Sequence, residues 1–515
     1  VDLNKNKTGV MQLPELIYFI YFAFLFGEKA IGLYEGRTDY NILLLLGLIM
    51  FLVKVAVTHH TVLEYVLMGG LLGICMIVYY NTGEKGLLLY FTMMLGMKSV
   101  SLKKVMQWAT IILGSAFFVL VFLTSFGFMQ DIIYVHDRRF FGQVVRHSLG
   151  YPYPNTLFTT YIVLMVLIMY LLGEQKIGDL IKVSVLMFVG AVFIYLYSCS
   201  NTGLIVSVFY LGMNFYFQSK KKVWLVDKFM TILMYPFCLV ISIICPLVVN
   251  GDLFWILDKI LHNRMNYANY YLTNEPITLF GTRFATPPND NYMIDSSFLY
   301  SFLQIGIIPF ILVTALMLWM IMYYVRDEKK IEMAIILSFC LLGLSDPFFF
   351  NLSYKNLLFL FVGALLYQTL EKMEPKENSF LWKKICLLSE VRRVKEGRRD
   401  ILDLEDSDRI EIRLPKSAVE WLTQKTNRIA YIIVHKKNLL FCIYLLSTAA
   451  ICAIVYAFSF SVNVSGAVDS VEEWEYFRRV MSYGIYGGII IAAGIIGFCL
   501  KKDPSEKNSN ANHNL

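Results

Sequence analysis

Charge and short catalytic motifs are both scarce in this sequence. Charged residues make up 17% of its 515 residues, whereas about a quarter of an average soluble domain is charged. The sequence contains no Walker loop, no H-E-x-x-H, no G-x-S-x-G and no histidine–cysteine cluster with zinc spacing. Nothing in it indicates ATP-driven chemistry, and we expect no cofactor.

Paired cysteines are also absent. The nine cysteines are scattered without a C-x-x-C motif, and most lie inside apolar stretches, as Cys75, Cys238, Cys340 and Cys452 do. Free cysteine is among the most buried residue types, so we interpret them as small core residues. No small-residue cleavage site follows the first apolar stretch, which we expect to be a retained helix rather than a signal peptide.

Long apolar runs are what the sequence does contain. Hydrophobic residues make up 57% of the chain and aromatic residues 15%, and the mean hydropathy is +0.57. A helix of about 20 apolar residues spans a bilayer, and about fourteen such runs occur. The predicted fold is an all-α, polytopic integral membrane protein with about 12–14 transmembrane helices. The runs are 14–34, 41–57, 61–80, 86–101, 105–128, 154–173, 181–199, 202–218, 229–249, 297–324, 332–350, 352–370, 438–462 and 478–500.

Lysine in the short loops predicts the orientation of these runs. Positive residues stay on the cytoplasmic side of a membrane, and alternation of the runs places Lys54, Lys98, Lys220 and Lys330 on one side. That side is predicted to be cytoplasmic and to hold both termini. The net charge of +7 has the same origin and does not indicate nucleic acid. The loops predicted on the outer side are 35–40, 81–85, 129–153, 250–296, 346–351 and 463–477.

Four parts make up the predicted organisation. Residues 1–370 form the polytopic membrane body, and residues 438–500 form an additional transmembrane hairpin. Residues 371–437 form a charged cytoplasmic segment, which either contacts anionic lipid headgroups or is simply solvated. Residues 501–515 are expected to be a disordered tail.

The first long outer loop, 129–153, is rich in cations and leads into a helix start. Pro154 and Asn155 open the next run, and proline suits the first turn of a helix. Arginine grips phosphate oxygens through a planar fork, and an outward-facing helix N-terminus offers free N–H groups to an anion. The alternative is a loop whose arginines contact lipid headgroups of the outer leaflet. The residues concerned are His136, Asp137, Arg138, Arg139, Arg146 and His147.

The second and longest outer loop, 250–296, combines cations with acids. Arg264 and Arg283 are its arginines, and Asp290 and Asp295 are two of its acids. Asp295 lies where the next apolar run begins, so it is either a general base or the N-cap of that helix. The tyrosines of the loop either stack on sugar rings or form an interfacial belt.

Two weaker signals lie at the ends of other runs. Glu28 and Lys29 lie within the first apolar run, where they can pair with each other. Asp346 lies at the outer end of a run, with Lys355 and Asn356 shortly after it. These residues either line an outer cavity or cap helices.

Three elements of the sequence together resemble a known family. Residues 146–155 resemble the R-x-S-(L/F)-G-(F/Y)-x-H-P-N element of bacterial Wzy-type polysaccharide polymerases, which belong to the O-antigen polymerase and ligase superfamily. Residues 261–281 resemble the L-x-x-R … P-(I/L)-x-L-F-G stretch of that family, and residues 295–306 resemble its D/H-N-x-(Y/F)-L … G element. The resemblance covers roughly residues 10–370, and it rests on the order, spacing and outer location of the three elements.

The resemblance implies a GT-C-like membrane glycosyltransferase without a metal. Its substrates would be oligosaccharide repeat units linked to undecaprenyl diphosphate on the outer leaflet of the bacterial plasma membrane. Its product would be a surface polysaccharide such as O-antigen, capsule or exopolysaccharide. Membrane lipid would surround it, and a flippase and a chain-length regulator would be its possible partners.

Residue roles follow from the same resemblance. Arg146 and Arg264 would neutralise charge on the leaving diphosphate, and Asp295 would be the base. His147 and His262 are alternative bases. The chain departs from the family pattern at Tyr153, where histidine is usual, and at Asp295 and Ser296. Other candidates for substrate binding are Arg138, Arg139, Asn155, Arg283 and Asp290.

Two other functions remain open on the sequence. A ligase of the same superfamily would transfer a finished glycan to another acceptor, but its branch has histidine at the position of Asp295. A flippase for lipid-linked oligosaccharides would line a membrane-deep cavity with cations. Ionisable residues are few inside the apolar runs, and the arginines gather in the outer loops. This distribution favours outer-face chemistry over transport.

Overall fold

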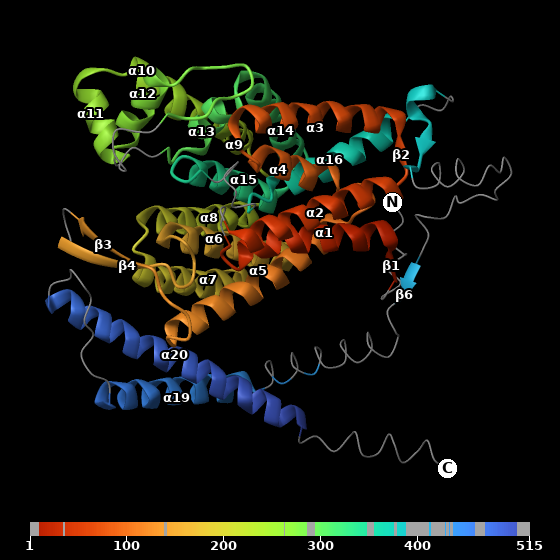
Figure 1. The fold of residues 1–515 in the computed structure, drawn as a ribbon. Coiled ribbons are helices and arrows are strands. Elements are labelled where there is room, and N and C mark those ends of the chain that lie inside the picture. Colours follow the sequence, from red (N-terminus) through yellow and green to blue (C-terminus); the bar gives the residue numbers. More distant parts are fainter. Residues whose placement is uncertain are drawn as a thin grey trace, which may run out of the picture. The chain divides into compact units, whose positions relative to one another are not determined.

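A computed structural model shows a mostly helical chain (Figure 1). It divides into two compact units, which are described separately. The first unit consists of residues 1–12, 118–150 and 411–515, and the second consists of residues 13–117 and 151–410. The described residues are 10–33, 37–138, 142–261, 263–285, 294–347, 355–374, 379–387, 411–413, 428, 432, 436–458 and 469–501.

Nine helices in the described part of the chain are long and apolar enough to cross a membrane. Because the remainder is also mainly helical, the prediction of an all-α polytopic membrane protein is confirmed. These candidate spans are Thr38–Val57, Val62–Thr82, Leu102–Ser125, Pro154–Leu172, Ile177–Ser198, Leu225–Val248, Ile307–Arg326, Asn438–Phe458 and Val471–Cys499.

The second unit contains most of the helices. Helix α5 (Leu102–Ser125) belongs to it as far as Phe117. Short segments η1 (Val240–Ile244, a π-helix), η2 (Phe380–Trp382), β2 (His60–Thr61) and β5 (Lys384–Ile385) complete it. Its other helices are α1 (Leu13–Ala30), α2 (Thr38–Val57), α3 (Val62–Thr82), α4 (Gly86–Leu95), α6 (Pro154–Leu172), α7 (Ile177–Ser198), α8 (Asn201–Ser219), α9 (Leu225–Leu239), α10 (Cys245–Val248), α11 (Gly251–Ile260), α12 (Arg264–Asn274), α13 (Ser297–Ile305), α14 (Ile307–Arg326), α15 (Lys330–Gly343) and α16 (Leu358–Met373).

Two predicted runs differ from the helices that form. The run 86–101 contains α4, which has only ten residues. At 1.5 Å per residue this helix is about 15 Å long, half the thickness of a bilayer core of about 30 Å. The run 297–324 is divided by Gly306, whose positive φ of 85° ends α13 before α14 begins.

Loops of the second unit contact one another at each of its two ends. Lys54 donates to the carbonyl of Lys98 over 2.8 Å, and Lys98 pairs with Glu64. Lys104 pairs with Glu15 at 2.7 Å. The predicted cytoplasmic segments around Lys54, Lys98 and Lys104 therefore lie together at one end, which we call the lysine-rich end.

The predicted outer loops contact one another in the same way. Asn81 donates to the carbonyl of Phe280 over 3.4 Å, and Ser297 donates to that of Asp346 over 2.5 Å. We call this the opposite end. That the lysine-rich end faces the cytoplasm stays a prediction.

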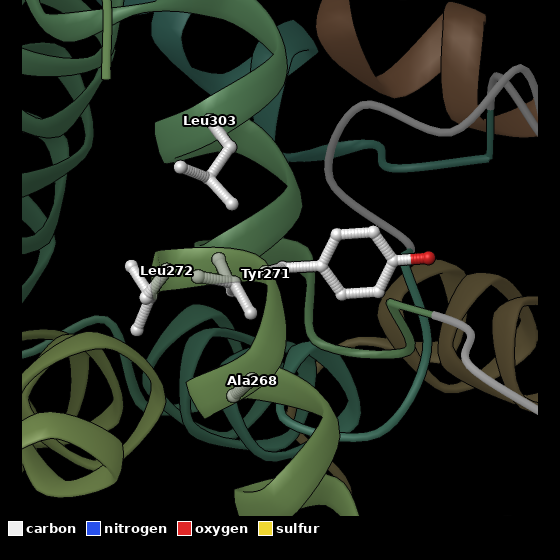
Figure 2. Close-up of a cluster of buried hydrophobic side chains, with 5 residues drawn as sticks. Ala268, Tyr271, Leu272 and Leu303 are labelled. Atoms are coloured by element: carbon white, nitrogen blue, oxygen red, sulfur yellow. The ribbon is translucent and has the colours of Figure 1, made fainter. Parts of the chain in front are cut away.

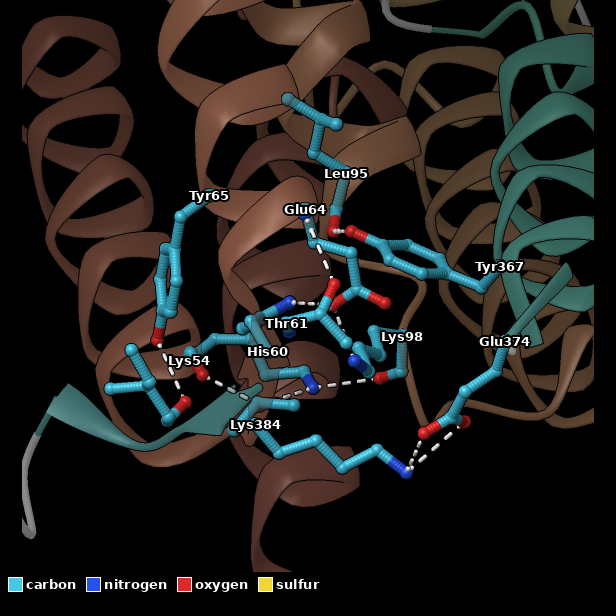
Figure 3. Close-up of polar contacts among 12 residues, drawn as sticks. Lys54, His60, Thr61, Glu64, Tyr65, Leu95, Lys98, Tyr367, Glu374 and Lys384 are labelled. Carbon is cyan, nitrogen blue, oxygen red and sulfur yellow. Dashed lines mark hydrogen bonds and ion pairs between the residues drawn. The ribbon is translucent and has the colours of Figure 1, made fainter. Parts of the chain in front are cut away.

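A buried polar network closes the lysine-rich end (Figure 3). Thr61 caps α3 through a capping box with Glu64. His60 contacts the same carboxylate through Nδ1 at 2.9 Å, and Lys98 pairs with it as well. The Glu64 carboxylate therefore interacts with His60, the backbone amide of Thr61 and Lys98 at once. These interactions offset the free-energy cost of burying its charge.

The same network binds the segment that follows α16. Strand β5 pairs with β2 in antiparallel register, and Tyr65 donates to the carbonyl of Ile385 over 3.4 Å. The Cys386 thiol reaches the carbonyl of Ala56 at 3.4 Å, and Lys384 pairs with Glu374 at 3.1 Å (Figure 3). Residues 379–387 are thus part of the bundle end, whereas most of the predicted cytoplasmic segment 371–437 lies outside the described residues.

The first unit combines a helical hairpin with two short antiparallel strand pairs. Helices α19 (Lys437–Phe458) and α20 (Asp469–Lys501) correspond to the predicted final hairpin, and α20 begins nine residues before the predicted run. A Cβ at Gly484 or Gly488 would overlap side chains of α19, so these glycines allow close helix packing. Strand β1 (Val10–Gln12) pairs with β6 (Glu411–Arg413), and β3 (Ile133–Arg138) pairs with β4 (Gly142–His147). The predicted outer loop 129–153 is therefore largely a β-hairpin. Of the predicted tail 501–515, Lys501 is the last residue of α20, and the rest lies outside the described residues.

Replacing Glu64 by Gln is predicted to lower the free energy of unfolding by about 3 kcal/mol, because it leaves the partly buried Lys98 without its counter-charge. Thermal unfolding of the full chain in detergent measures the effect. The matched control is Asp179→Asn, since Asp179 pairs with Lys182 on an exposed helix surface and such pairs contribute little. Equal stability of the two variants would contradict the structural role of the network.

Candidate functional site

Helices α12, in the loop 250–296, and α13, which follows that loop, form a packed platform at the opposite end (Figure 2). The segment 250–296 was predicted to be a loop, and it contains the helices α11 and α12. Helix α12 begins at Arg264 and packs on α13, which begins two residues after Asp295. Their apolar contact holds the start of each helix in a fixed position. The buried residues of the cluster are Ala268, Tyr271, Leu272, Leu299 and Leu303.

Two glycines bring the second and third sequence elements together. Gly281 ends the L-F-G element, and Gly306 ends α13. Both have positive φ angles, and a Cβ on either one would overlap the backbone of the other segment. Amides of Ile307 and Ile308 donate to carbonyls in 278–279 over 3.0 and 3.1 Å. The spacing of these elements thus reflects a direct backbone contact that only glycine permits.

Arg264 and Asp295 form an ion pair on this platform. The guanidinium Nη2 lies 2.9 Å from Asp295 Oδ2, and the two side chains are 22% and 40% exposed. Arg264 also donates to the carbonyls of Leu261 and Ser345, over 3.2 and 3.4 Å. Its buried Nε has no hydrogen-bond partner among the described residues. The arginine is thus held in place while one donor is left for a further acceptor.

Burial and Arg264 act on Asp295 in opposite directions. Burial raises the pKa of Asp295, and the positive charge and hydrogen bond of Arg264 lower it. Burial is the larger effect, so the pKa of Asp295 lies above that of an ordinary aspartate. A carboxylate with a raised pKa is a better proton acceptor. No side-chain cap is formed at the start of α13, whose N-cap residue is Ser296.

A second carboxylate lies beside this ion pair. Asp346 accepts from the hydroxyl of Thr159 on α6 over 3.0 Å, and its backbone carbonyl accepts from Ser297. Burial and the charge of Asp295 raise the pKa of Asp346 to about 6, against the opposing effects of Thr159, Lys355 and Arg264. Asp346 therefore links α6, α13 and the connection after α15.

A buried lysine, Lys355, is close enough to Asp346 for their charges to interact. Lys355 donates to the hydroxyl of Thr160 over 2.6 Å, and its ammonium lies 5.3 Å from the centre of the Tyr151 ring. Burial and the charge of Lys29 lower the pKa of Lys355 to about 7, although Asp346 opposes them. In the sequence, Asp346 and Lys355 stood out only as weak signals. Their hydrogen-bond partners are the adjacent residues Thr159 and Thr160 of α6, and these two threonines form no sequence motif that would have pointed to a site.

Other predicted residues of the second unit lie apart from this group or outside the described residues. Asn155 is exposed at the second position of α6. Arg283 is exposed and lies next to Gly83, in the turn between α3 and α4. His262 and Asp290 lie outside the described residues.

The predicted residues of the first unit lie on its β-hairpin. Arg146 is on β4, opposite Tyr134 of β3, and Arg138 is the last residue of β3. Arg139 lies outside the described residues. The structure places Arg146 and Arg264 in different units, so their predicted convergence on one diphosphate stays a prediction.

His147 bridges two carboxylates within the first unit. Its Nδ1 lies 2.5 Å from Asp131 Oδ2, and its Nε2 lies 2.5 Å from Glu475 Oε2 on α20. Arg478 pairs with the other oxygen of Glu475 at 2.8 Å. Only an imidazolium donates from both ring nitrogens. Burial alone would lower the pKa of His147, but its two carboxylate partners together raise it.

The fold and the site geometry can be compared with known proteins. No protein-family model, curated protein or solved structure matches this chain. Function must therefore be argued from the site itself, because folds host many unrelated activities.

The His147 bridge is predicted to give the first unit a pH-dependent stability. Because the folded-state pKa is raised, the stabilisation is complete below the ordinary histidine pKa of about 6.5 and is lost as the pH rises through the raised value. The difference in unfolding temperature between wild type and His147→Gln measures it. A difference that is constant from acid to alkaline pH would contradict a charged bridge.

Gly281→Ala is predicted to destabilise the protein by about 2 kcal/mol or more, because the new Cβ would overlap the carbonyl of Gln304 at a strained φ of 84°. Thermal unfolding tests this expectation. Gly212→Ala on α8 is the matched control, since a Cβ there meets open space and alanine favours a helix by about 1 kcal/mol. Similar responses of the two variants would show that the 281–306 contact is unimportant.

Proposed function

We propose that this protein is a membrane glycosyltransferase that polymerises lipid-linked oligosaccharides. Its substrates are repeat units on undecaprenyl diphosphate at the outer leaflet of the bacterial plasma membrane, and its product is a surface polysaccharide. The observation that carries the proposal is the Arg264–Asp295 ion pair at 2.9 Å. In this pair the guanidinium of Arg264, which can bind an anion, contacts the carboxylate of Asp295, which can accept a proton. The pair lies at the end of a bundle of apolar helices.

The ion pair supports a simple exchange on substrate binding. A diphosphate offers arginine more oxygen acceptors than one carboxylate does. When the donor diphosphate takes the guanidinium of Arg264, Asp295 loses its counter-charge and becomes more basic. The resting pair therefore keeps the base inactive until a substrate arrives.

The chemistry that follows needs one bond to form and one to break. The acceptor hydroxyl, on the nonreducing end of one lipid-linked unit, attacks the anomeric carbon of the growing chain. Asp295 accepts the proton of that hydroxyl, while the bond between the anomeric carbon and the donor diphosphate breaks. Arg264 neutralises the charge that develops on the leaving diphosphate.

The sequence resemblance implies that Arg146 also binds diphosphate, and this role stays a prediction. Arg146 lies on β4 next to His147, which the contacts with Asp131 and Glu475 hold in place. The three-element resemblance also supports the polymerase over a ligase, because aspartate occupies position 295. A ligase would use the same leaving group, so the acceptor distinguishes the two activities.

Polymerisation of a purified lipid-linked repeat unit tests the proposal. Arg264→Ala is expected to reduce chain extension by about 10²–10³-fold and Asp295→Asn by about 10²–10⁴-fold. Arg264→Lys should also be impaired, since a point charge does not reproduce the fork. Arg326→Ala is the control, because Arg326 is exposed at the end of α14.

Two results would overturn the proposal. One is polymer of normal length and amount from both Arg264→Ala and Asp295→Asn. The other is a wild-type protein that transfers a glycan only to an acceptor other than the lipid-linked repeat, which would make it a ligase.

A further inference from the structure

Lys355 is a buried cation in the same group of residues as the ion pair. Only 2% of its surface is exposed, although it lies in the connection between two helices rather than inside one. A charge removed from water is costly unless it is paired. Ionisable groups retained in the interior of a membrane protein usually have a functional partner.

The described partners of Lys355 are all uncharged. Its ammonium donates to Thr160, whose own hydroxyl donates to the carbonyl of Thr156 over 2.7 Å. The ring of Tyr151 lies 5.3 Å away and is itself fixed by a hydrogen bond to the carbonyl of Ala30. Since an ammonium has three N–H donors, Thr160 leaves two of them without a hydrogen-bond acceptor among the described residues.

The charges around Lys355 do not provide a counter-ion in contact with it. Among the described residues no carboxylate lies within ion-pair distance of its ammonium. Asp346 acts on it electrostatically, but Asp346 accepts from Thr159 and is also influenced by Asp295 and Arg264. A second buried ammonium, Lys29, is near enough to disfavour the charge on Lys355.

We propose that Lys355 is a second cation of the substrate site, positioned by Thr160 and Tyr151 to bind phosphate oxygens together with Arg264. The inference deepens the proposed function and rests on it for the source of the phosphate, a lipid-linked diphosphate. In the protein without ligand, the negative charges of Asp295 and Asp346 balance the positive charges of Arg264 and Lys355. A bound diphosphate would neutralise the two cations in place of the acids, and its oxygens would accept the hydrogen bonds that Lys355 can still donate.

This role makes a distinctive prediction about stability. A lysine that serves the fold stabilises the protein, whereas a buried cation kept for a ligand destabilises the empty protein. Lys355→Met is therefore expected to raise the unfolding temperature of the purified full chain without ligand. It should also weaken binding of inorganic pyrophosphate by about tenfold or more, because hydrogen bonds to a charged group are lost.

Thermal unfolding in detergent across a pyrophosphate titration measures both effects at once. Lys98→Met is the matched control, since Lys98 is a partly buried lysine with a carboxylate partner at the lysine-rich end. It is expected to lower the unfolding temperature and to leave the pyrophosphate response unchanged. Thr160→Val keeps the lysine but removes the hydroxyl that accepts its hydrogen bond. This variant should weaken the pyrophosphate response while the protein stays folded.

The source of the phosphate is tested by competition. Undecaprenyl diphosphate should displace pyrophosphate, whereas phosphatidylglycerol should not. The inference is overturned if wild-type protein shows no pyrophosphate response, if Lys355→Met keeps it, if Lys355→Met destabilises the empty protein as Lys98→Met does, or if phosphatidylglycerol alone competes.

Failure here is distinguishable from failure of the proposed function. Loss of polymer in Arg264→Ala with an unchanged pyrophosphate response in Lys355→Met would remove only the lysine from the site. Normal polymer in Arg264→Ala and Asp295→Asn, with the expected Lys355 results, would leave an anion site without the proposed chemistry.

Discussion

The pairing of buried charge is the constraint on which this structure depends. A bundle of apolar helices offers little to solvate an ion, so each buried ionic group needs a partner or a ligand. Arg264 and Asp295 show the outcome at one end of the second unit. The pair is only partly buried, and two backbone carbonyls hold its arginine. It is stable enough to fix two helix starts and accessible enough to exchange partners.

The two ends of the second unit use charge differently. At the lysine-rich end, Glu64 is shared by His60, Lys98 and the start of α3. That network closes the fold and leaves little capacity for a ligand. At the opposite end, the Nε of Arg264 and the ammonium of Lys355 retain donors that the described protein does not use. This asymmetry is the main reason to assign binding to one end and stability to the other.

Much of the fold could be predicted from the sequence, because a membrane requires long apolar helices and no other helical pattern imitates them. The predicted grouping of loops also agrees with the contacts. The helices α11 and α12 were missed because they lie in a polar segment with only short apolar stretches. The split at Gly306 was missed because a single glycine within an apolar run carries no periodic signal.

The candidate site was predictable only in part. Arg264 and Asp295 stood out as a cation and an acid in a predicted outer loop, and the structure joins them. Asp346, Lys355 and the two threonines of α6 come from distant parts of the chain, and only folding brings them together. His147 looked like a possible base, but its carboxylate partners are Asp131, sixteen residues earlier, and Glu475 on α20. No spacing rule connects such residues.

The most direct test of this account is a structure of the full chain in lipid nanodiscs with undecaprenyl diphosphate bound. The measured quantity is the distance from the guanidinium of Arg264 to its nearest oxygen acceptors. The account predicts that Arg264 has left Asp295 and contacts phosphate oxygens at about 2.7–2.9 Å, with the Lys355 ammonium facing the same group. An intact Arg264–Asp295 pair, with the diphosphate bound elsewhere, would contradict it.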